Sequence, residues 1–294
     1  AGGVRRGRAF AVTVNVTLHR AAAGRGKSVG LAIREKWRQM RERDGNRVHD
    51  NNWHPIWEPG TLKAVKAIGW FIEEYGAAQI SINLTNIQVT PVHIAFDEVC
   101  KAAEQRGIRV TGSELVGRIP LSSMLDAGRY FLRKQQRSTG VSDKELIKIA
   151  IRSLGLAELG PFRPEEKIIE YAIAEKKSRL VDLSLGDFIE ETASESAAPG
   201  GGSISAAIGA FGAALGTMVA NLSAHKKGWD DRWEDFSDWA EKGKALYTEL
   251  SALIDRDTEA FNELMAAFAL QKSSDSEIAA RASAIQTATK RAIE

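Results

Sequence analysis

A run of three glycines leading into a helix of small residues is the feature that most constrains the fold of this chain. Residues 197–203 read AAPGGGS, and residues 204–222 are almost all Ala, Gly, Leu, Ile, Val, Met and Phe. The free N–H groups at a helix start can bind an anion, and glycines leave room for it. We therefore expect a long helix that begins at the glycines, with either an anion site or a plain interhelix turn at its start. The segment matches neither a P-loop nor a dinucleotide-binding fingerprint, because no Gly-Lys-Ser/Thr follows it and no strand precedes it.

Length and composition indicate a soluble protein of about two domains. The chain has 294 residues, of which 44% are hydrophobic and 27% are charged,. Its one cysteine, Cys100, excludes an internal disulfide and favours a reducing compartment, so we expect a cytoplasmic protein,. Residues 1–50 hold twelve Lys or Arg against four Asp or Glu. This basic segment either forms an ordinary solvated surface or attracts acidic partners. No nucleic-acid-binding signature accompanies it, so we expect no nucleic acid.

The small-residue segment 204–222 is long enough to span a bilayer,. Ser205, Thr217 and Asn221 interrupt it, and its Ala and Gly residues are only weakly apolar. We therefore expect no membrane association and a buried helix of a soluble protein. The glycines at 212 and 216 would allow close approach of a neighbouring helix.

The first half of the chain has the pattern of a small sheet with two helices. Residues 10–18 alternate apolar and polar side chains and predict a strand, and residues 28–43 predict a basic helix,. The runs 62–72 and 78–84 predict a hairpin, with its turn at 73–76,. Thr90 as the N-cap and Pro91 as the first helical residue predict a helix that stops at Gly107, before a strand at 108–111,. The order is β-α-β-β-α-β, a ferredoxin-like arrangement with both helices on one face and both parallel and antiparallel neighbours.

The second half is predicted to be helical throughout. Helices are expected at 121–135, 142–154 and 164–174, a charged linker at 174–183, and then helices at 184–196, 204–222, 230–270 and from 275 onward,. The fold class is therefore α+β, a ferredoxin-like subdomain followed by an incomplete all-α domain. The expected domains are residues 1–176 and 184–294.

Several motifs of the chain resemble a known pair of enzyme families. Residues 81–86 (SINLTN), 89–94 (VTPVHI), 98–100 (EVC), 110–117 (VTGSELVG), 134–135 (KQ) and 161–171 (PFRPEEKIIEY) resemble the C-terminal subdomain of glutamate formiminotransferases. Residues 198–203 (APGGGS), 212–216 (GAALG) and 253–261 (LIDRDTEAF) resemble the start of formiminotetrahydrofolate cyclodeaminases. The order is that of the bifunctional formimidoyltransferase-cyclodeaminases.

The resemblance implies a folate-dependent enzyme of histidine degradation and one-carbon metabolism. The transferase would move a formimino group from N-formimino-L-glutamate to N5 of tetrahydrofolate. The cyclodeaminase would then close N5 and N10 around that carbon, giving 5,10-methenyltetrahydrofolate and ammonia. Tetrahydrofolate would be a co-substrate, and its acidic polyglutamate tail a partner for the basic segment. We also expect a homo-oligomer.

The resemblance also implies roles for individual residues. Asp257 matches the aspartate proposed as catalytic in cyclodeaminases, where a carboxylate would pass a proton to the departing amine,. It shares the apolar side of its helix with Ile254 and Phe261, whereas Asp255 points elsewhere,. Substrate or folate contacts are expected from the sheet residues Asn83, Thr85 and Glu114 and from Gly200, Gly201, Gly202 and Ser203.

Three histidines are expected to have no catalytic or metal-binding role. His93, in the first turn of a predicted helix, is expected to cap or pack. His49 and His54 lie in a polar loop without the spacing of a known metal site, so we expect no metal,.

The family pattern is incomplete in this sequence. The family's N-terminal transferase subdomain, which carries its catalytic histidine, would precede Ala1, and its glycine-rich folate loop would survive only near Gly2 and Gly3. We therefore expect a fragment of a longer protein whose transferase half is inactive. Two alternatives to the bifunctional enzyme stay open: a methenyltetrahydrofolate cyclohydrolase, and a non-catalytic folate-binding or assembly module.

Overall fold

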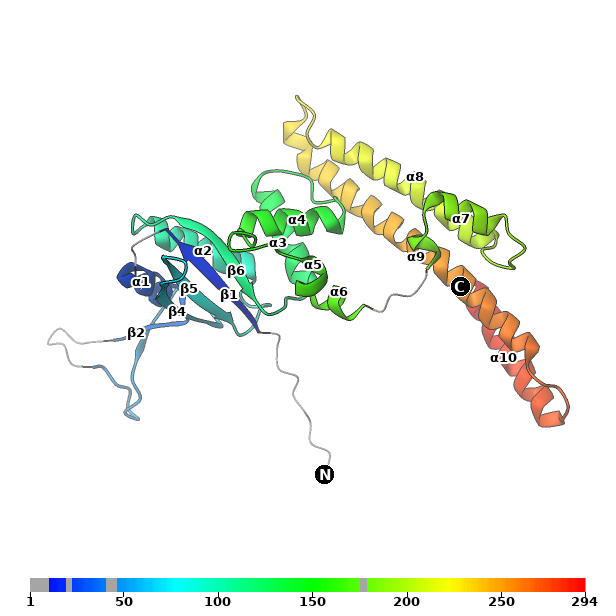
Figure 1. Cartoon of the computed structure of the whole chain (residues 1–294), viewed down its shortest axis with the longest axis horizontal. Helices are drawn as coiled ribbons and strands as arrows, with labels where there is room; N and C mark the ends of the chain where they lie inside the picture. Colours follow the sequence, from blue (N-terminus) through cyan, green and yellow to red (C-terminus); the bar gives the residue numbers. More distant parts are fainter. Residues whose placement is uncertain (1–10, 20–22, 41–46, 175–178, 294) are drawn as a thin grey trace. The chain divides into compact units, whose positions relative to one another are not determined.

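The computed structural model describes residues 11–19, 23–40, 47–174 and 179–293 (Figure 1). The chain forms two compact units, one of Ala1–Gln135 and Asp143–Ala174, the other of Gln136–Ser142 and Glu175–Glu294. The expected end of the first domain at 176 falls within residues 175–178, which lie outside the described part, as do Gly2 and Gly3. The expected domain boundaries stay a prediction. The assignment of residues 136–142 to the second unit has no counterpart in the sequence pattern.

A four-stranded sheet forms the centre of the first unit. Its strands are β1 (Val12–Leu18), β4 (Val65–Ile72), β5 (Ala77–Leu84) and β6 (Val110–Val116), in the order β4-β5-β1-β6. With α1 (Ala23–Ile33) and α2 (Val92–Glu104) they confirm the ferredoxin-like arrangement. Every pair of neighbouring strands is antiparallel, so the expected parallel neighbours were wrong. Alternate residues of β1, from Val12 to Leu18, are buried in the core,.

The helix predicted at 28–43 is shorter and earlier than expected. It ends at Ile33, and Lys36–Gln39 forms strand β2, which pairs antiparallel with β3 (Trp57–Pro59). The reason is tertiary hydrogen bonding. Ile33 accepts the backbone N–H of Leu62 at 3.1 Å, and Glu35 donates its backbone N–H to Val65 at 3.0 Å. These bonds replace the hydrogen bonds that a longer helix would form, because the backbone groups at the end of α1 find partners in other segments.

Helix α2 begins differently from the prediction. Thr90 was expected to cap it, but Pro91 occupies the N-cap position and the Thr90 hydroxyl donates to the Lys63 carbonyl at 2.7 Å. The stop expected at Gly107 comes slightly earlier: α2 ends at Glu104, and the turn after it closes at Gly107, with φ at +67°. The later helices of this unit are α3 (Leu121–Lys134), α4 (Asp143–Leu154), α5 (Pro164–Lys167) and α6 (Ile169–Ile173).

The second unit is helical in its described part. Its elements are the short helix η1 (Leu180–Asp182), α7 (Leu185–Thr192), α8 (Gly201–Ser223), the short helix η2 (Asp230–Arg232), α9 (Trp233–Ala269) and α10 (Asp275–Ile293). Ser184 caps α7 by accepting the backbone N–H of Asp187 at 3.1 Å,. Helices α8 and α9 lie side by side (Figure 1). Small residues such as Gly243, which packs against Thr217, allow this close approach,.

Residues 136–142 pack on the α8–α9 pair within this unit. Ser138 donates to the side chain of Asn221 at 2.6 Å, and Asn221 donates back to the Gly140 carbonyl at 3.1 Å. The backbone N–H of Thr139 binds the Ser237 hydroxyl at 3.0 Å. A Cβ on Gly140 would overlap Ala240, so the backbone touches α9 directly.

Helix α8 is less buried than expected. By length and composition it could cross a membrane, with a mean hydropathy of 1.6, and only 33% of its most apolar stretch is buried. A single helix of this kind is weak support for membrane insertion, because core helices of soluble proteins share these properties. Its exposed large side chains are Ile208, Phe211, Leu215, Met218, Val219 and Leu222.

Candidate functional site

The carboxylate of Asp257 lies against the start of helix α8. Its Oδ2 accepts the backbone N–H of Ser203 at 2.8 Å and lies 2.9 Å from the Ser203 hydroxyl. Ser203 is the third residue of α8, so its N–H has no partner within the helix,. The N-cap residue Gly200 has no side chain to supply one. Asp257, which comes from α9, therefore caps α8 and links the two helices.

The glycines next to this contact differ in what surrounds them. A Cβ on Gly202 would lie 2.6 Å from Cγ of Asp257, so the carboxylate occupies the space that any other residue would fill. Nothing lies within 4 Å of a Cβ on Gly200 or Gly201. Gly202 is therefore required by the carboxylate, whereas the other two glycines leave open space at the helix start.

Ser203 is fully buried, and its hydroxyl faces α9. It lies 2.9 Å from the Ile254 carbonyl and 3.2 Å from the Thr258 hydroxyl, in addition to its contact with Asp257. The side chain is thus occupied by interactions within the protein. Its geometry supports a role in holding Asp257.

An open groove of about 660 Å³ runs beside Asp257. Gly202, Ser205, Arg256, Glu259 and Arg291 line it together with apolar side chains. Arg291 forms an ion pair with Glu263, whereas Arg256 is exposed and has no ion pair within the described part of the chain. The groove therefore combines a carboxylate, arginines and apolar walls.

Asp255 has a different partner, as the helix periodicity predicted. Its Oδ1 accepts the backbone N–H of Leu180 in η1 at 2.7 Å. Asp255 thus holds the segment before α7, and the two carboxylates do not form an acid–base pair.

The sheet brings two of its three predicted site residues to one face. Asn83 lies opposite Thr13, and Glu114 lies opposite Asn15, so both flank β1 on the face away from the buried Val14,. Asn83 accepts the Thr13 hydroxyl at 2.6 Å, and Glu114 is half-buried. Thr85 lies just beyond β5, where both its hydroxyl and its N–H bind the Ala64 carbonyl at 2.9 Å.

Sequence reasoning missed Asn15 at the centre of this face. It lies between Ser81 and Glu114 in the register, and its Oδ1 is buried without a hydrogen-bond partner in the described part of the chain. Buried polar atoms without partners are uncommon and call for an explanation. The signal was available, because Asn15 is a polar position in the alternation of residues 12–18.

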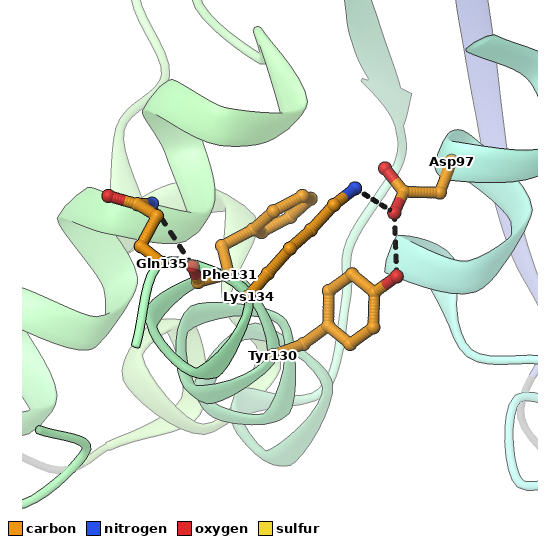
Figure 2. Close-up of polar contacts among 5 residues, drawn as sticks. All are labelled: Asp97, Tyr130, Phe131, Lys134 and Gln135. Atoms are coloured by element: carbon orange, nitrogen blue, oxygen red, sulfur yellow. Dashed lines mark hydrogen bonds and ion pairs between the residues drawn. The ribbon is translucent and has the colours of Figure 1, made fainter. Parts of the chain in front are cut away.

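A polar cluster joins α2 to α3 (Figure 2). Asp97 accepts the Tyr130 hydroxyl and the Lys134 ammonium group, each at 2.6 Å. The ring of His93 stacks on Tyr130 with centroids 4.6 Å apart. Of the two roles expected for His93, capping and packing, the structure shows packing, against Tyr130. The residues at 134–135 are structural here, since Gln135 donates to the Phe131 carbonyl at 3.0 Å.

The environment of this cluster shifts the pKa values of three side chains. The hydrogen bond to Asp97, and then burial, raise the pKa of Tyr130 to about 12,. Burial raises the pKa of the Cys100 thiol to about 11. Burial lowers the pKa of His93, against the opposing effect of Asp126 and Asp97. At neutral pH Cys100 and Tyr130 are therefore protonated.

Metal ligation finds no support in the described part of the chain. No group of three or more His, Cys, Asp or Glu side chains comes together there. His54 lies 3.4 Å from Asp50, and both are largely exposed.

Comparison with known proteins relates each half of the chain to one family. Residues 11–174 match the family described as Formiminotransferase domain, and residues 184–294 match the family described as Formiminotransferase-cyclodeaminase. The chain is 38% identical over 239 residues to the formimidoyltransferase-cyclodeaminase of Gallus gallus, which covers 81% of this chain and 44% of that protein. The Mus musculus enzyme is 36% identical over 238 residues, 80% of this chain and 44% of that protein.

A further relative matches a shorter stretch of the chain. The methenyltetrahydrofolate cyclohydrolase of Methylorubrum extorquens is 42% identical over 107 residues, 36% of this chain and 51% of that protein. The chain spans less than half the length of the bifunctional relatives that it matches.

Proposed function

The chain belongs to the formiminotransferase–cyclodeaminase family, and on that premise we propose that the protein acts in folate-dependent formimino-group metabolism. The proposed substrates are N-formimino-L-glutamate and tetrahydrofolate for the transfer step. The proposed product of the second step is 5,10-methenyltetrahydrofolate with release of ammonia. The two matched segments, in the order of the bifunctional relatives, support this proposal.

The single observation that best supports the cyclodeaminase step is the placement of Asp257. Its carboxylate lies beside an open groove, at the glycine-rich start of α8. In the reaction N10 bonds to the formimino carbon and loses its proton, and the bond from that carbon to the departing nitrogen breaks. Asp257 would take the N10 proton and deliver it to the departing nitrogen. One further proton from solution balances the formation of the methenyl cation and ammonia.

The groove offers contacts for the rest of the substrate. Gly200 and Gly201 have open space around them, and Arg256 carries an exposed positive charge. We expect the glycines to contact the folate and Arg256 to attract its acidic tail. The basic segment 1–50 would serve the same purpose.

For the transfer step, the proposed contacts lie on the open face of the sheet. Asn83 and Glu114 share this face on either side of β1, and Thr85 lies at its edge. Side-chain carbonyl and carboxylate groups there could accept N–H groups of a pterin ring or a formimino group. Oδ1 of Asn15, which has no hydrogen-bond partner among the described residues, offers another acceptor in the same place.

We also expect a cytoplasmic homo-oligomer that needs no metal. The exposed apolar side chains of α8, such as Phe211 and Leu215, support self-association,. One cysteine in 294 residues agrees with a reducing compartment,.

A second candidate function is hydrolysis of 5,10-methenyltetrahydrofolate, because 107 residues of the chain are 42% identical to a methenyltetrahydrofolate cyclohydrolase. One experiment separates the two. The protein is incubated with 5-formiminotetrahydrofolate or with 5,10-methenyltetrahydrofolate, and ammonia and the methenyl absorbance are followed. Ammonia release with a rise of the methenyl absorbance supports the cyclodeaminase. Loss of the methenyl absorbance without ammonia supports the cyclohydrolase. Folate binding without turnover of either compound would leave a binding module.

A further inference from the structure

We propose that Ser203 is a positioning residue for Asp257, and that Oδ1 of Asp257 is the oxygen that exchanges the proton with the substrate. This inference rests on the cyclodeaminase function proposed above. It assigns different tasks to the two oxygens of one carboxylate, and it gives a chemical reason for the lack of a side chain at Gly202. It also gives the buried Ser203 a part in the reaction without substrate contact.

Two donors from one residue converge on Oδ2 of Asp257. The backbone N–H of Ser203 lies at 2.8 Å and its hydroxyl at 2.9 Å. The N–H direction is set by helix α8, and the fully buried side chain has little freedom to turn. The Ser203 hydroxyl has one proton, and both Oδ2 of Asp257 and the Ile254 carbonyl lie 2.9 Å from its oxygen. The charged carboxylate is the stronger of these two acceptors, so it takes the hydrogen bond.

The other oxygen, Oδ1, has no hydrogen bond within the described part of the chain. It lies over the bare backbone of Gly202, and both residues line the open groove. A side chain at position 202 would overlap this oxygen. Oδ1 is therefore the atom left for a ligand.

A carboxyl group with one anchored oxygen and one free oxygen is suited to gaining and losing a proton in each turnover. When Oδ1 carries the proton, Oδ2 is a carbonyl-like oxygen and still accepts both hydrogen bonds. The donors on Oδ2 need not move between the two protonation states, so the carboxyl stays in one orientation. A proton on Oδ2 would instead break the bond from the Ser203 N–H, because two donors would face each other. Holding a reacting group in place in this way can be worth about 10²-fold in rate.

The test compares Ser203→Ala and Gly202→Ala with matched controls in the full chain. Ser251→Ala is the control for the first, because its hydroxyl binds a backbone carbonyl on α9, that of Tyr247, away from the groove. Gly212→Ala is the control for the second, because nothing lies within 4 Å of a Cβ there. Ammonia release from 5-formiminotetrahydrofolate gives kcat and KM.

We expect kcat to fall by about 10- to 100-fold in Ser203→Ala and Gly202→Ala, with KM changed by less than about twofold. Both controls should keep the kcat of the unmodified protein. Thermal unfolding identifies a variant that fails to fold, and the other variant then decides. A kcat unchanged in a folded Ser203→Ala or Gly202→Ala protein would overturn the proposal, as would a loss that appears only in KM.

Hydrogen exchange tests the contact without any activity. The Ser203 amide should exchange faster in Asp257→Ala than in the unmodified protein, and Asp255→Ala should leave its exchange unchanged. Equal exchange in all three proteins would overturn the proposed anchoring. An unmodified protein that releases no ammonia would refute the proposed function instead, and the exchange result would still decide whether Ser203 holds the carboxylate.

Discussion

Asp255 and Asp257 lie two residues apart on α9 and hold different parts of the second unit. Asp255 accepts the backbone N–H of Leu180 at 2.7 Å, and Asp257 accepts that of Ser203 at 2.8 Å. Both carboxylates thus bind a backbone donor, but only Asp257 lines the groove next to the glycines. The two residues carry the same charge, lie on the same helix and bind the same type of partner. Comparing their variants therefore separates a catalytic role from a structural one.

We expect Asp257→Asn to abolish most of the cyclodeamination and Asp255→Asn to cost far less. An amide oxygen can still accept the Ser203 N–H, so the cap on α8 is kept, but an amide cannot carry the proton. The expected loss in kcat is about 10²- to 10⁴-fold for Asp257→Asn. The measurement is ammonia release from 5-formiminotetrahydrofolate. Similar small losses in both variants would make Asp257 a purely structural residue.

We expect Gly69→Ala to destabilise the first unit. A Cβ on Gly69 of β4 would overlap the backbone of Gly26 and Lys27 in α1, so the helix would have to move off the sheet. The expected loss in the free energy of unfolding is about 1–3 kcal/mol. Urea unfolding measures it, with Gly160→Ala as the control, because nothing lies within 4 Å of a Cβ there. Equal stability of the two variants would show that α1 does not pack as described.

The buried His93 should make the first unit less stable in mild acid. Burial lowers its folded pKa below the ordinary value of 6.5, against the charges of Asp97 and Asp126. The unfolded chain therefore binds the proton more tightly, and stability is lost as the pH falls through about 6.5. His93→Phe keeps a ring next to Tyr130 and removes this titration. Urea unfolding between about pH 7.5 and 5.5 should show a weaker pH dependence for the variant. Parallel curves would contradict the prediction.

Cys100 should react slowly with alkylating reagents in the folded protein. Burial raises the pKa of its thiol to about 11, so only about one molecule in a thousand carries the reactive thiolate at pH 8,. As the chain has a single cysteine, iodoacetamide labelling followed by mass spectrometry reports on Cys100 alone. Labelling should become at least about tenfold faster after unfolding in urea. Rapid labelling of the native protein would show that the thiol is accessible and ionised.

Local pattern was enough to predict the sheet and most helices. Alternation in residues 12–18, the hairpin around Gly76 and the turn at Gly107 that follows α2 are short-range features, and all three stand in the structure. The long helix α9 and the glycine start of α8 were likewise visible in the sequence. These features succeed because their periodicity and backbone preferences act over a few residues.

The sequence by itself determined the order of the elements, the glycine-rich start of α8 and the candidate carboxylate Asp257. Only the tertiary structure decided that α1 stops at Ile33, because its last backbone groups bind residues that are distant in the chain. It also decided that Ser203 faces α9 and that the Asp257 carboxylate fills the space beside Gly202. Contacts of this kind join residues between 29 and 55 positions apart. No local propensity encodes which distant backbone group will be the partner.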